Sequence, residues 1–284
     1  MATALIALPA VERLSPRCIR ILGGNPGKYT LQGTNTYLLG TGSRRILIDT
    51  GEGKPAWLSS LKATLERENA TVESALITHW HGDHVGGIPD LLKVWPNASI
   101  YKNTPDEGMQ DIKDGQVFAA QGVTLTASHT PGHTKDHMVF TMAEEDAMFT
   151  ADNVLGQGTA VFENLSDYMR SLAKMKTLFK GRAYPGHGPV LEDGPSKIME
   201  YIEHRRQREQ QVLETLRSDR EGSDSGGSWT PMEMVQVIYK EVPEALHAAA
   251  CGGLVQTLGK LEGEGKVVRA GADGWRLVEG KPSL

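Results

Sequence analysis

The sequence predicts an α+β fold in which helices cover mixed β-sheets, followed by a small, mostly helical C-terminal domain. Between Val11 and Pro195, short apolar or β-branched runs alternate with Gly-rich turns and a few helical patterns, which is typical of layered α+β domains. Beyond Pro195 the chain becomes polar and mostly helical in pattern. We therefore expect a large domain over residues 11–195, a polar helix and linker over residues 196–228, and a small domain over residues 229–284.

The large domain begins with three expected strands, at residues 18–22, 35–39 and 45–48. Turns containing Gly and Pro separate these strands, which indicates an antiparallel meander. In residues 54–69 the apolar side chains recur at helical spacing, so a helix is expected there, before a fourth strand at residues 72–77. The rest of the domain is expected to contain strands at 99–101, 123–129, 136–141, 147–151 and 182–184, and a helix at 165–179.

The C-terminal third is expected to be helical until it ends in a hairpin. Thr230 and Glu233 have the spacing of a helix capping box, and Pro231 occupies the first helical position. The order helix, helix, hairpin that follows indicates a winged-helix-like domain. The expected elements are a polar helix at 196–218, a Gly/Ser/Asp-rich linker at 219–228, helices at 231–239 and 243–261, and a hairpin at 265–277.

Composition excludes several classes of protein. Charged residues make up 23% and hydrophobic residues 39% of the 284 residues, and no apolar run approaches the roughly 20 residues needed to cross a bilayer. The formal net charge of -5 provides no global attraction to nucleic acids or anionic membranes. Because only two cysteines occur, Cys18 and Cys251, and no targeting signal is evident, a cytoplasmic protein without a disulfide framework is expected.

The most unusual stretch of the sequence is Thr78-His79-Trp80-His81-Gly82-Asp83-His84. It places three imidazoles and a carboxylate within six residues, directly after an expected strand. Protonated imidazoles at such density would repel one another, and buried neutral imidazoles would each need a polar partner. The stretch therefore predicts a site for divalent metal ions.

Three further candidate ligands, His133, Asp152 and His187, each follow the end of an expected strand. An isolated histidine is more often an ordinary core or surface residue than a ligand. Here, however, five of the nine histidines fall in only three loops. Because loops at strand ends can bring several side chains to one point, the set as a whole favours a shared metal site.

The order and spacing of these motifs resemble those of the metallo-β-lactamase superfamily, and the resemblance covers Arg17 to about Pro195. It implies an αββα sandwich with a dinuclear metal site at one edge. It also implies how the ligands are divided: His79, His81 and His133 would hold one metal, Asp83, His84 and His187 the other, and Asp152 would bridge the two.

The resemblance also assigns roles to two carboxylates. Asp49, within Ile48-Asp49-Thr50-Gly51, matches the first motif of the superfamily and is expected to orient a ligand histidine. Asp83 is expected to orient the attacking water or to accept its proton. The ligand set suits two zinc ions, although a carboxylate bridge also tolerates manganese or iron. Hydrolysis is the expected reaction, because two metals lower the pKa of a shared water and polarise the substrate oxygen.

The residues of three segments narrow the resemblance to the β-lactamase-like protein 2 subgroup. These runs are Thr30-Leu31-Gln32-Gly33-Thr34-Asn35-Thr36-Tyr37, Leu47-Ile48-Asp49-Thr50-Gly51-Glu52 and Thr78-His79-Trp80-His81. Two activities are known in this subgroup. Fungal enzymes release or cyclise aromatic polyketides from the acyl carrier domain of a non-reducing polyketide synthase, whereas enzymes of animal mitochondria are single-strand-selective endoribonucleases.

Charge favours the polyketide enzymes. A ribonuclease should present Lys and Arg along the path of the strand, with aromatic platforms for the bases, whereas residues 228–284 contain six basic and seven acidic residues. The Ala- and Gly-rich residues 248–253 are expected to form a packed or acyl-lining helix. We therefore expect a metal-dependent thioesterase of the fungal polyketide type, with an acyl carrier domain and a polyketide as its partners. The endoribonuclease is the alternative.

Two other functions are less well supported by the sequence. A glyoxalase-like glutathione thioesterase would need a basic cluster for the glutathione carboxylates, for which only residues 204–208 are available. A scaffold protein would be expected to have a degraded site, yet every ligand type is present. Near the site, residues 23–27 and 32–36 are candidates for substrate contact, and His137 is expected to make local hydrogen bonds.

Overall fold

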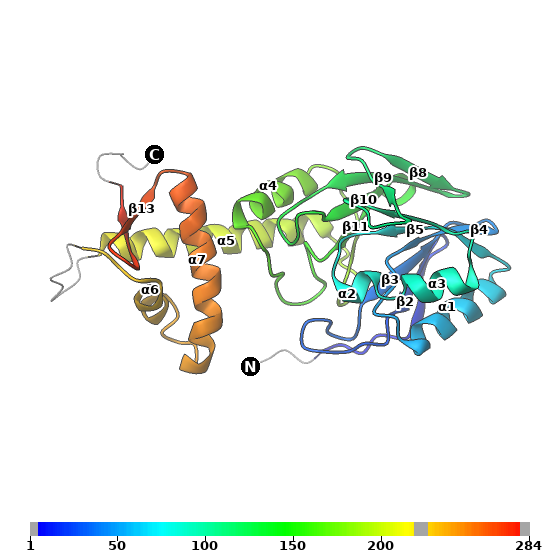
Figure 1. The fold of residues 1–284 in the computed structure, drawn as a ribbon, viewed down its shortest axis with the longest axis horizontal. Coiled ribbons are helices and arrows are strands. Elements are labelled where there is room, and N and C mark those ends of the chain that lie inside the picture. The colour runs from blue at the N-terminus through cyan, green and yellow to red at the C-terminus, as the bar shows by residue number, and fades with distance from the viewer. Residues whose placement is uncertain (1–4, 219–226, 279–284) are drawn as a thin grey trace. The chain divides into compact units, whose positions relative to one another are not determined.

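Two β-sheets form the centre of the larger part of the chain in this computed structural model, which describes residues 5–218 and 227–278 (Figure 1). The first sheet contains seven strands in sequential order, antiparallel from β1 to β4 and parallel from β4 to β7. Its strands are β1 (Val11–Ser15), β2 (Cys18–Leu22), β3 (Asn35–Leu39), β4 (Arg44–Ile48), β5 (Thr71–Ile77), β6 (Ser99–Lys102) and β7 (Gln110–Asp111).

The second sheet contains five strands in the order β12-β11-β10-β9-β8. It is antiparallel except between β11 and β12, which run parallel. A parallel pair needs a crossover connection, and the crossover between β11 and β12 contains the helix α4 (Leu165–Met175). The strands are β8 (Val117–Ala120), β9 (Val123–His129), β10 (Met138–Met142), β11 (Ala147–Ala151) and β12 (Ala183–Pro185).

Alternation along the strands divides the buried side chains between two cores. Tyr37 and Leu39 of β3 face the second sheet and pack in one cluster with Phe140 and Phe149, whereas Leu38 belongs to the cluster on the other face of the first sheet. This two-residue period follows from the pleat of a strand, which turns successive side chains to opposite faces. Burial of each phenylalanine contributes about 1.5–3 kcal/mol.

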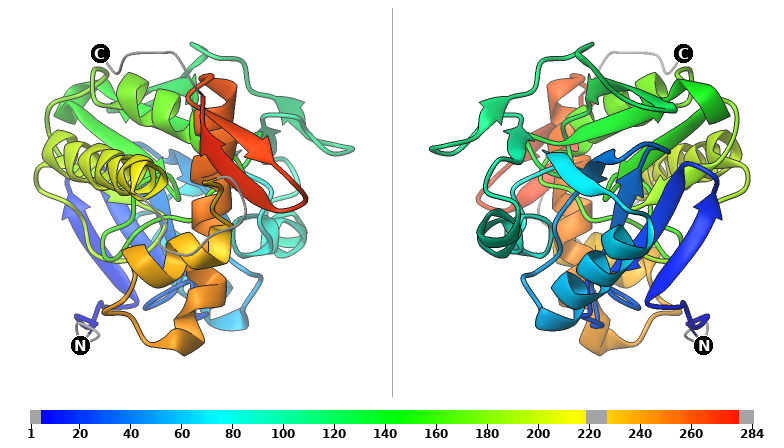
Figure 2. Two further views of the ribbon diagram at one scale, coloured as in Figure 1. Left: turned by 90° about the vertical axis from the view of Figure 1, so that its left-hand side faces the viewer. Right: turned by 90° about the vertical axis from the view of Figure 1, so that its right-hand side faces the viewer.

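Helices cover the outer faces of both sheets. Trp57 and Leu61 of α1 (Pro55–Arg67) and Leu91 of α3 (Ile88–Val94) pack on the outer face of the first sheet. Helix α4 and the start of α5 (Gly194–Arg217) lie beside the second sheet (Figure 1; Figure 2). The layers therefore run helix, sheet, sheet, helix, and the predicted αββα sandwich is confirmed.

The chain divides into two compact units between Tyr201 and Ile202, within α5. The second unit contains the rest of α5, α6 (Pro231–Ile238), α7 (His247–Gly263) and the hairpin of β13 (Val267–Ala270) and β14 (Gly274–Leu277). Its own core includes Leu216, Leu258 and Trp275. The expected capping box at the start of α6 is present, with Thr230 and Glu233 bonded reciprocally.

Several elements differ from the expectations. The short elements α3, β7 and β8 were not expected. A 3-10 helix (Glu244–Leu246) precedes α7, so the helix expected at 243–261 starts about four residues later than expected. Residues 248–253 pack only in part, because Ala250 and Cys251 lie against the core of the second unit whereas Ala248, Gly252 and Gly253 are exposed. Most of the expected linker, 219–226, lies outside the described residues. Within the described ranges, no helix is both long and apolar enough to cross a membrane.

Candidate metal centre

The His-rich stretch begins where β5 ends, at the edge between the two sheets. His81 immediately precedes the single-turn helix α2 (Gly82–Val85), which carries Asp83 and His84. The turn after α2 packs closely on the first sheet, since a Cβ atom added to Gly87 would lie 2.0 Å from the carbonyl oxygen of Thr50. Close backbone packing therefore fixes the position of α2 and of its two side chains.

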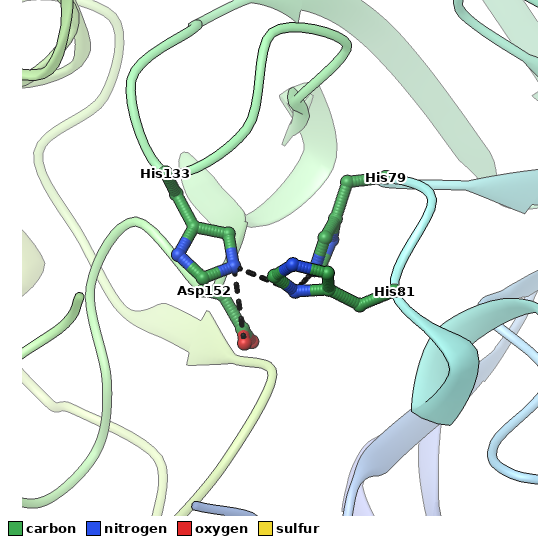
Figure 3. Close-up of side chains that lie close together, drawn as sticks. All are labelled: His79, His81, His133 and Asp152. Atoms are coloured by element: carbon green, nitrogen blue, oxygen red, sulfur yellow. Dashed lines mark hydrogen bonds and ion pairs between the residues drawn. The ribbon is translucent and has the colours of Figure 1, made fainter. Parts of the chain in front are cut away.

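One group of side chains that could hold a metal ion consists of His79, His81, His133 and Asp152 (Figure 3). Nδ1 of His81 lies 3.0 Å from Nε2 of His79 and 3.1 Å from Nε2 of His133. Nε2 of His133 lies 3.6 Å from Oδ2 of Asp152. The four ligand atoms come from three separate loops and lie within 4.8 Å of one another.

A second group consists of Asp83, His84 and His187. Oδ2 of Asp83 lies 3.3 Å from Nε2 of His84 and 3.3 Å from Nε2 of His187. Asp152 also faces this group, at 3.5 Å from Nε2 of His84 and 3.2 Å from Nε2 of His187. The structure thus brings all seven sequence-predicted ligand residues together, with Asp152 between the two groups.

The polar atoms at this centre fit a cation. Nε2 of His84 and Oδ1 of Asp152 are both buried, and within the described part of the chain neither has a hydrogen-bond partner. A buried polar atom without a partner destabilises the fold by about 1–3 kcal/mol. Imidazole nitrogens and carboxylate oxygens at such positions suit a divalent metal such as zinc.

Three of the histidines have their outer ring nitrogen engaged, which turns Nε2 toward the centre. His84 donates from Nδ1 to Oδ2 of Asp49 at 2.7 Å, and His133 donates from Nδ1 to the carbonyl oxygen of Val161 at 2.8 Å. The hydroxyl of Thr78 donates to Asp49, so it accepts from Nδ1 of His79 at 2.9 Å. Each Nε2 therefore points to the centre, where it can coordinate a metal ion.

Asp49 makes several hydrogen bonds beside the candidate ligands. Besides the contact with His84, its carboxylate accepts from the backbone N–H and the hydroxyl of Thr78, at 2.8 and 2.9 Å. One carboxylate therefore holds two neighbouring histidines, one directly and one through Thr78.

Charge at the centre is balanced between carboxylates and imidazoles. Burial disfavours the ionised form of Asp83, but the neighbouring imidazoles of His187 and His84 outweigh it and hold the pKa of Asp83 far below its ordinary value. Burial likewise opposes a charge on His187, yet the carboxylate of Asp152 raises the pKa of this imidazole to about 9. Burial holds the pKa of His79 well below its ordinary value. The two carboxylates stay ionised, as ligands for a cation must be.

A cavity of about 470 Å³ opens onto both groups of ligands. Its walls include the segment Lys28–Leu31, which lies between the two stretches expected to contact substrate, and the loop at residues 157–161. The phenol of Tyr201 holds this loop, because it donates to the carbonyl oxygen of Gly158 at 2.8 Å. Neither wall segment contributes a candidate metal ligand, so the metal-binding motifs did not indicate them, although the family run that begins at Thr30 overlaps the first segment.

His137 is buried and lies outside both groups. Its Nδ1 atom lies 3.2 Å from the hydroxyl of Thr130 and 3.1 Å from Nδ2 of Asn153. The predicted local hydrogen bonds are confirmed.

Models of two protein families match this chain. The model of the metallo-beta-lactamase superfamily matches residues 29–187. The chain belongs to the metallo-beta-lactamase superfamily. A second model, the beta-lactamase associated winged helix domain, matches residues 230–275, which confirms the winged-helix-like prediction.

Two similar relatives come from fungi. The chain is 47% identical to the atrochrysone carboxyl ACP thioesterase of Aspergillus chevalieri, over 95% of this chain and 90% of the relative. It is 49% identical to the lactamase-like protein aptB of Emericella nidulans, over 92% and 85% of the two chains.

Solved structures of the superfamily share the fold. A metallo-beta-lactamase family protein from Thermus thermophilus aligns with a TM-score of 0.71 at 22% identity, covering 94% of this chain and all of that chain. A beta-lactamase domain protein from Burkholderia ambifaria aligns with a TM-score of 0.77 at 16% identity, covering 96% and 95%. At such identities the likeness concerns the fold alone.

Proposed function

We propose that the protein is a metal-dependent thioesterase that releases an aromatic polyketide, by hydrolysis or cyclisation, from the acyl carrier domain of a non-reducing polyketide synthase. The observation that carries this proposal is the 47% identity, over 95% of the chain, to a fungal enzyme named as an acyl carrier protein thioesterase. The converging histidines and carboxylates support the hydrolytic chemistry. A cytoplasmic location is part of the same proposal.

The ligand groups support two metal ions, which we propose to be zinc, with manganese as the alternative. His79, His81 and His133 would hold one ion, Asp83, His84 and His187 the other, and Asp152 would lie between them. When bound, such ions lower the pKa of a water molecule and polarise the carbonyl oxygen of the substrate.

Asp83 is the candidate for proton transfer. Its side chain is 22% exposed and lines the cavity, so the carboxylate is open to solvent on the substrate side. Because the carboxylate is ionised, it can orient the attacking water and accept its proton. Water then adds to the thioester carbonyl, the carbon–sulfur bond breaks, and the products are a carboxylic acid and the free thiol of the carrier.

The cavity suits a small acyl group. Its volume of about 470 Å³ lies within the roughly 300–1,000 Å³ of small-molecule sites. Leu31, Leu155 and Val161 provide apolar wall, and Lys28 is the one Lys or Arg among the described residues that line it. An apolar wall is expected for an aromatic acyl chain, whereas a nucleic-acid path needs several cations.

The winged-helix unit gives little support to the endoribonuclease. Lys260, the one Lys or Arg of α7, lies 2.9 Å from Glu209 and 2.6 Å from Glu264. Arg269 on the hairpin lies 3.7 Å from Glu262 and 4.9 Å from the ring centre of Trp275. Neighbouring carboxylates offset these two cations, so they attract phosphates less than unpaired Lys and Arg side chains would.

Parallel assays of two substrates test the proposal. The purified full-length protein is given an acyl carrier domain loaded with an aromatic polyketide thioester and, separately, labelled single-stranded RNA. We expect release of the acyl group and intact RNA. Cleavage of RNA with an intact thioester would overturn the proposal in favour of the endoribonuclease.

A further inference from the structure

The hydroxyl of Thr34 contacts the proposed proton acceptor from outside the metal-binding motifs. Thr34 is fully buried just before β3, and its hydroxyl donates to Oδ2 of Asp83 at 2.8 Å. Its backbone forms an antiparallel bridge with His187. One residue of the connection between β2 and β3 therefore touches two members of the second ligand group.

Asn25 determines where the Thr34 hydrogen goes. The Oδ1 atom of Asn25 accepts from the backbone N–H of Thr34 at 2.9 Å, and its Nδ2 atom donates to the Thr34 hydroxyl oxygen at 3.0 Å. The reversed amide would turn its NH2 group toward the Thr34 N–H, placing two donors face to face, so this orientation is fixed. Since the hydroxyl accepts from Asn25, its own hydrogen is directed to Asp83.

The backbone around Asn25 leaves space for this contact. A Cβ atom added to Gly23 would lie 2.7 Å from Oδ1 of Asn25, and one added to Gly33, where φ is +122°, would lie 3.3 Å from the same oxygen. Larger residues at either position would displace the amide. The glycines in the connection between β2 and β3, which turn formation alone could explain, thus also make room for Asn25.

We propose that Asn25 and Thr34 are positioning residues for Asp83. The donated hydrogen bond holds Oδ2 toward His84 and His187, which keeps the carboxylate in one rotamer and leaves its other oxygen available to the cavity. The expected effect on kcat rests on the proposed function. The expected effect on metal affinity does not depend on the substrate.

Removal of the hydroxyl tests the role of Thr34. In Thr34→Val, which keeps the shape of the side chain, we expect kcat for the carrier thioester and affinity for zinc each to fall about 10–100-fold. KM should change less than about threefold, since Thr34 is buried behind Asp83. Thr34→Ser, which retains the hydroxyl, should stay within about threefold of the wild-type protein in both measurements. Zinc affinity is measured by chelator competition on metal-depleted full-length protein.

Replacement of the amide by a carboxylate tests the role of Asn25. In Asn25→Asp the new side chain still accepts from the Thr34 N–H but cannot donate to the hydroxyl, which then donates to the introduced carboxylate instead of to Asp83. We expect this variant to lose as much kcat as Thr34→Val. In the double variant Asn25→Asp/Thr34→Val, kcat should fall less than about twofold below that of either single variant, because both substitutions act through the same hydrogen bond.

Thr36→Val is the matched control. The Thr36 hydroxyl is equally buried on β3, donates to the carbonyl oxygen of Ile21 at 2.8 Å and accepts from Nε1 of Trp57 at 2.9 Å. This control should lower the melting temperature but retain zinc affinity and kcat.

Equal losses of kcat and zinc affinity in Thr34→Val and Thr34→Ser would overturn the inference. So would additive losses of kcat in Asn25→Asp/Thr34→Val. The same zinc affinity in Thr34→Val and Thr36→Val would overturn it as well. A wild-type protein that binds zinc but releases no acyl group would instead overturn the proposed function. In that case the comparison of zinc affinities would still decide the role of Thr34.

Discussion

The Nδ1 atom of His84 lies 2.7 Å from Oδ2 of Asp49, and both side chains are almost fully buried. Asp49 adopts a left-handed backbone conformation, with φ of +59°, at the turn that follows β4. This conformation is uncommon outside glycine, and asparagine and aspartate tolerate it best. A short acidic residue at this position therefore satisfies both the turn and the histidine.

Asp49→Asn should separate these two requirements. Asparagine tolerates the left-handed backbone, but its amide cannot accept from His84 and from both donors of Thr78 at once. We expect metal affinity or activity to fall about 10–100-fold with little change in melting temperature. Asp49→Ala should add backbone strain and lower the melting temperature as well. Normal metal binding in the asparagine variant would contradict the orienting role of Asp49.

Asp83→Asn should remove most turnover while the fold is retained. The amide has the shape of the carboxylate but cannot accept a proton from water. Loss of a general base typically lowers the rate about 10²–10⁴-fold. The measurement compares kcat with the melting temperature of the same preparation. A near-normal rate would refute the role of Asp83 in proton transfer.

Gly132→Ala should damage both the fold and the ligand that follows it, His133. Gly132 has φ of +135°, and an added Cβ atom would lie 2.3 Å from Cα of Tyr168 in α4. We expect the free energy of unfolding to fall by about 1–3 kcal/mol, with weaker metal binding. Gly252→Ala is the control, since no atom lies within 4 Å of the added Cβ and alanine favours a helix by about 0.5–1 kcal/mol. Equal melting temperatures for the two variants would disprove this packing.

The two thiols should differ in reactivity. Cys18 is fully buried, and burial raises the pKa of its thiol well above the ordinary value, whereas Cys251 is half-buried and lines a cavity of about 410 Å³ beside the hairpin. Since the thiolate is the reactive form, an aromatic disulfide reagent should modify one thiol per chain in the native protein and two in denaturant. Equal native rates for both thiols would contradict the burial of Cys18.

The ligand residues could be predicted from sequence because metal chemistry restricts both residue type and position. His133 and His187 are far from His79 in sequence, but each follows a recognisable strand, and strand ends of paired sheets meet at one edge. The roles of these residues as ligands remain predictions until an ion is observed. Asp49 could be predicted only through a family motif, since an aspartate after a strand has no distinctive chemistry of its own.

The cavity wall and the Asn25–Thr34 pair could not be predicted in the same way. Lys28, Tyr29 and Val161 have no shared motif, and they meet only because two long loops fold over the same edge. Asn25 and Thr34 lie in a segment whose Gly, Asn and Pro residues turn chemistry already explains. Short elements such as α3 and β8 were missed because a few residues carry too little periodicity.

Titration of metal-depleted protein with zinc, followed by thioester hydrolysis, tests the central claim most directly. We expect the protein without metal to be folded and inactive, and the activity to rise to a plateau at two zinc ions per chain. Full hydrolysis by protein shown to contain no metal, or a plateau at a single ion, would contradict the two-metal centre built from His79, His81, Asp83, His84, His133, Asp152 and His187.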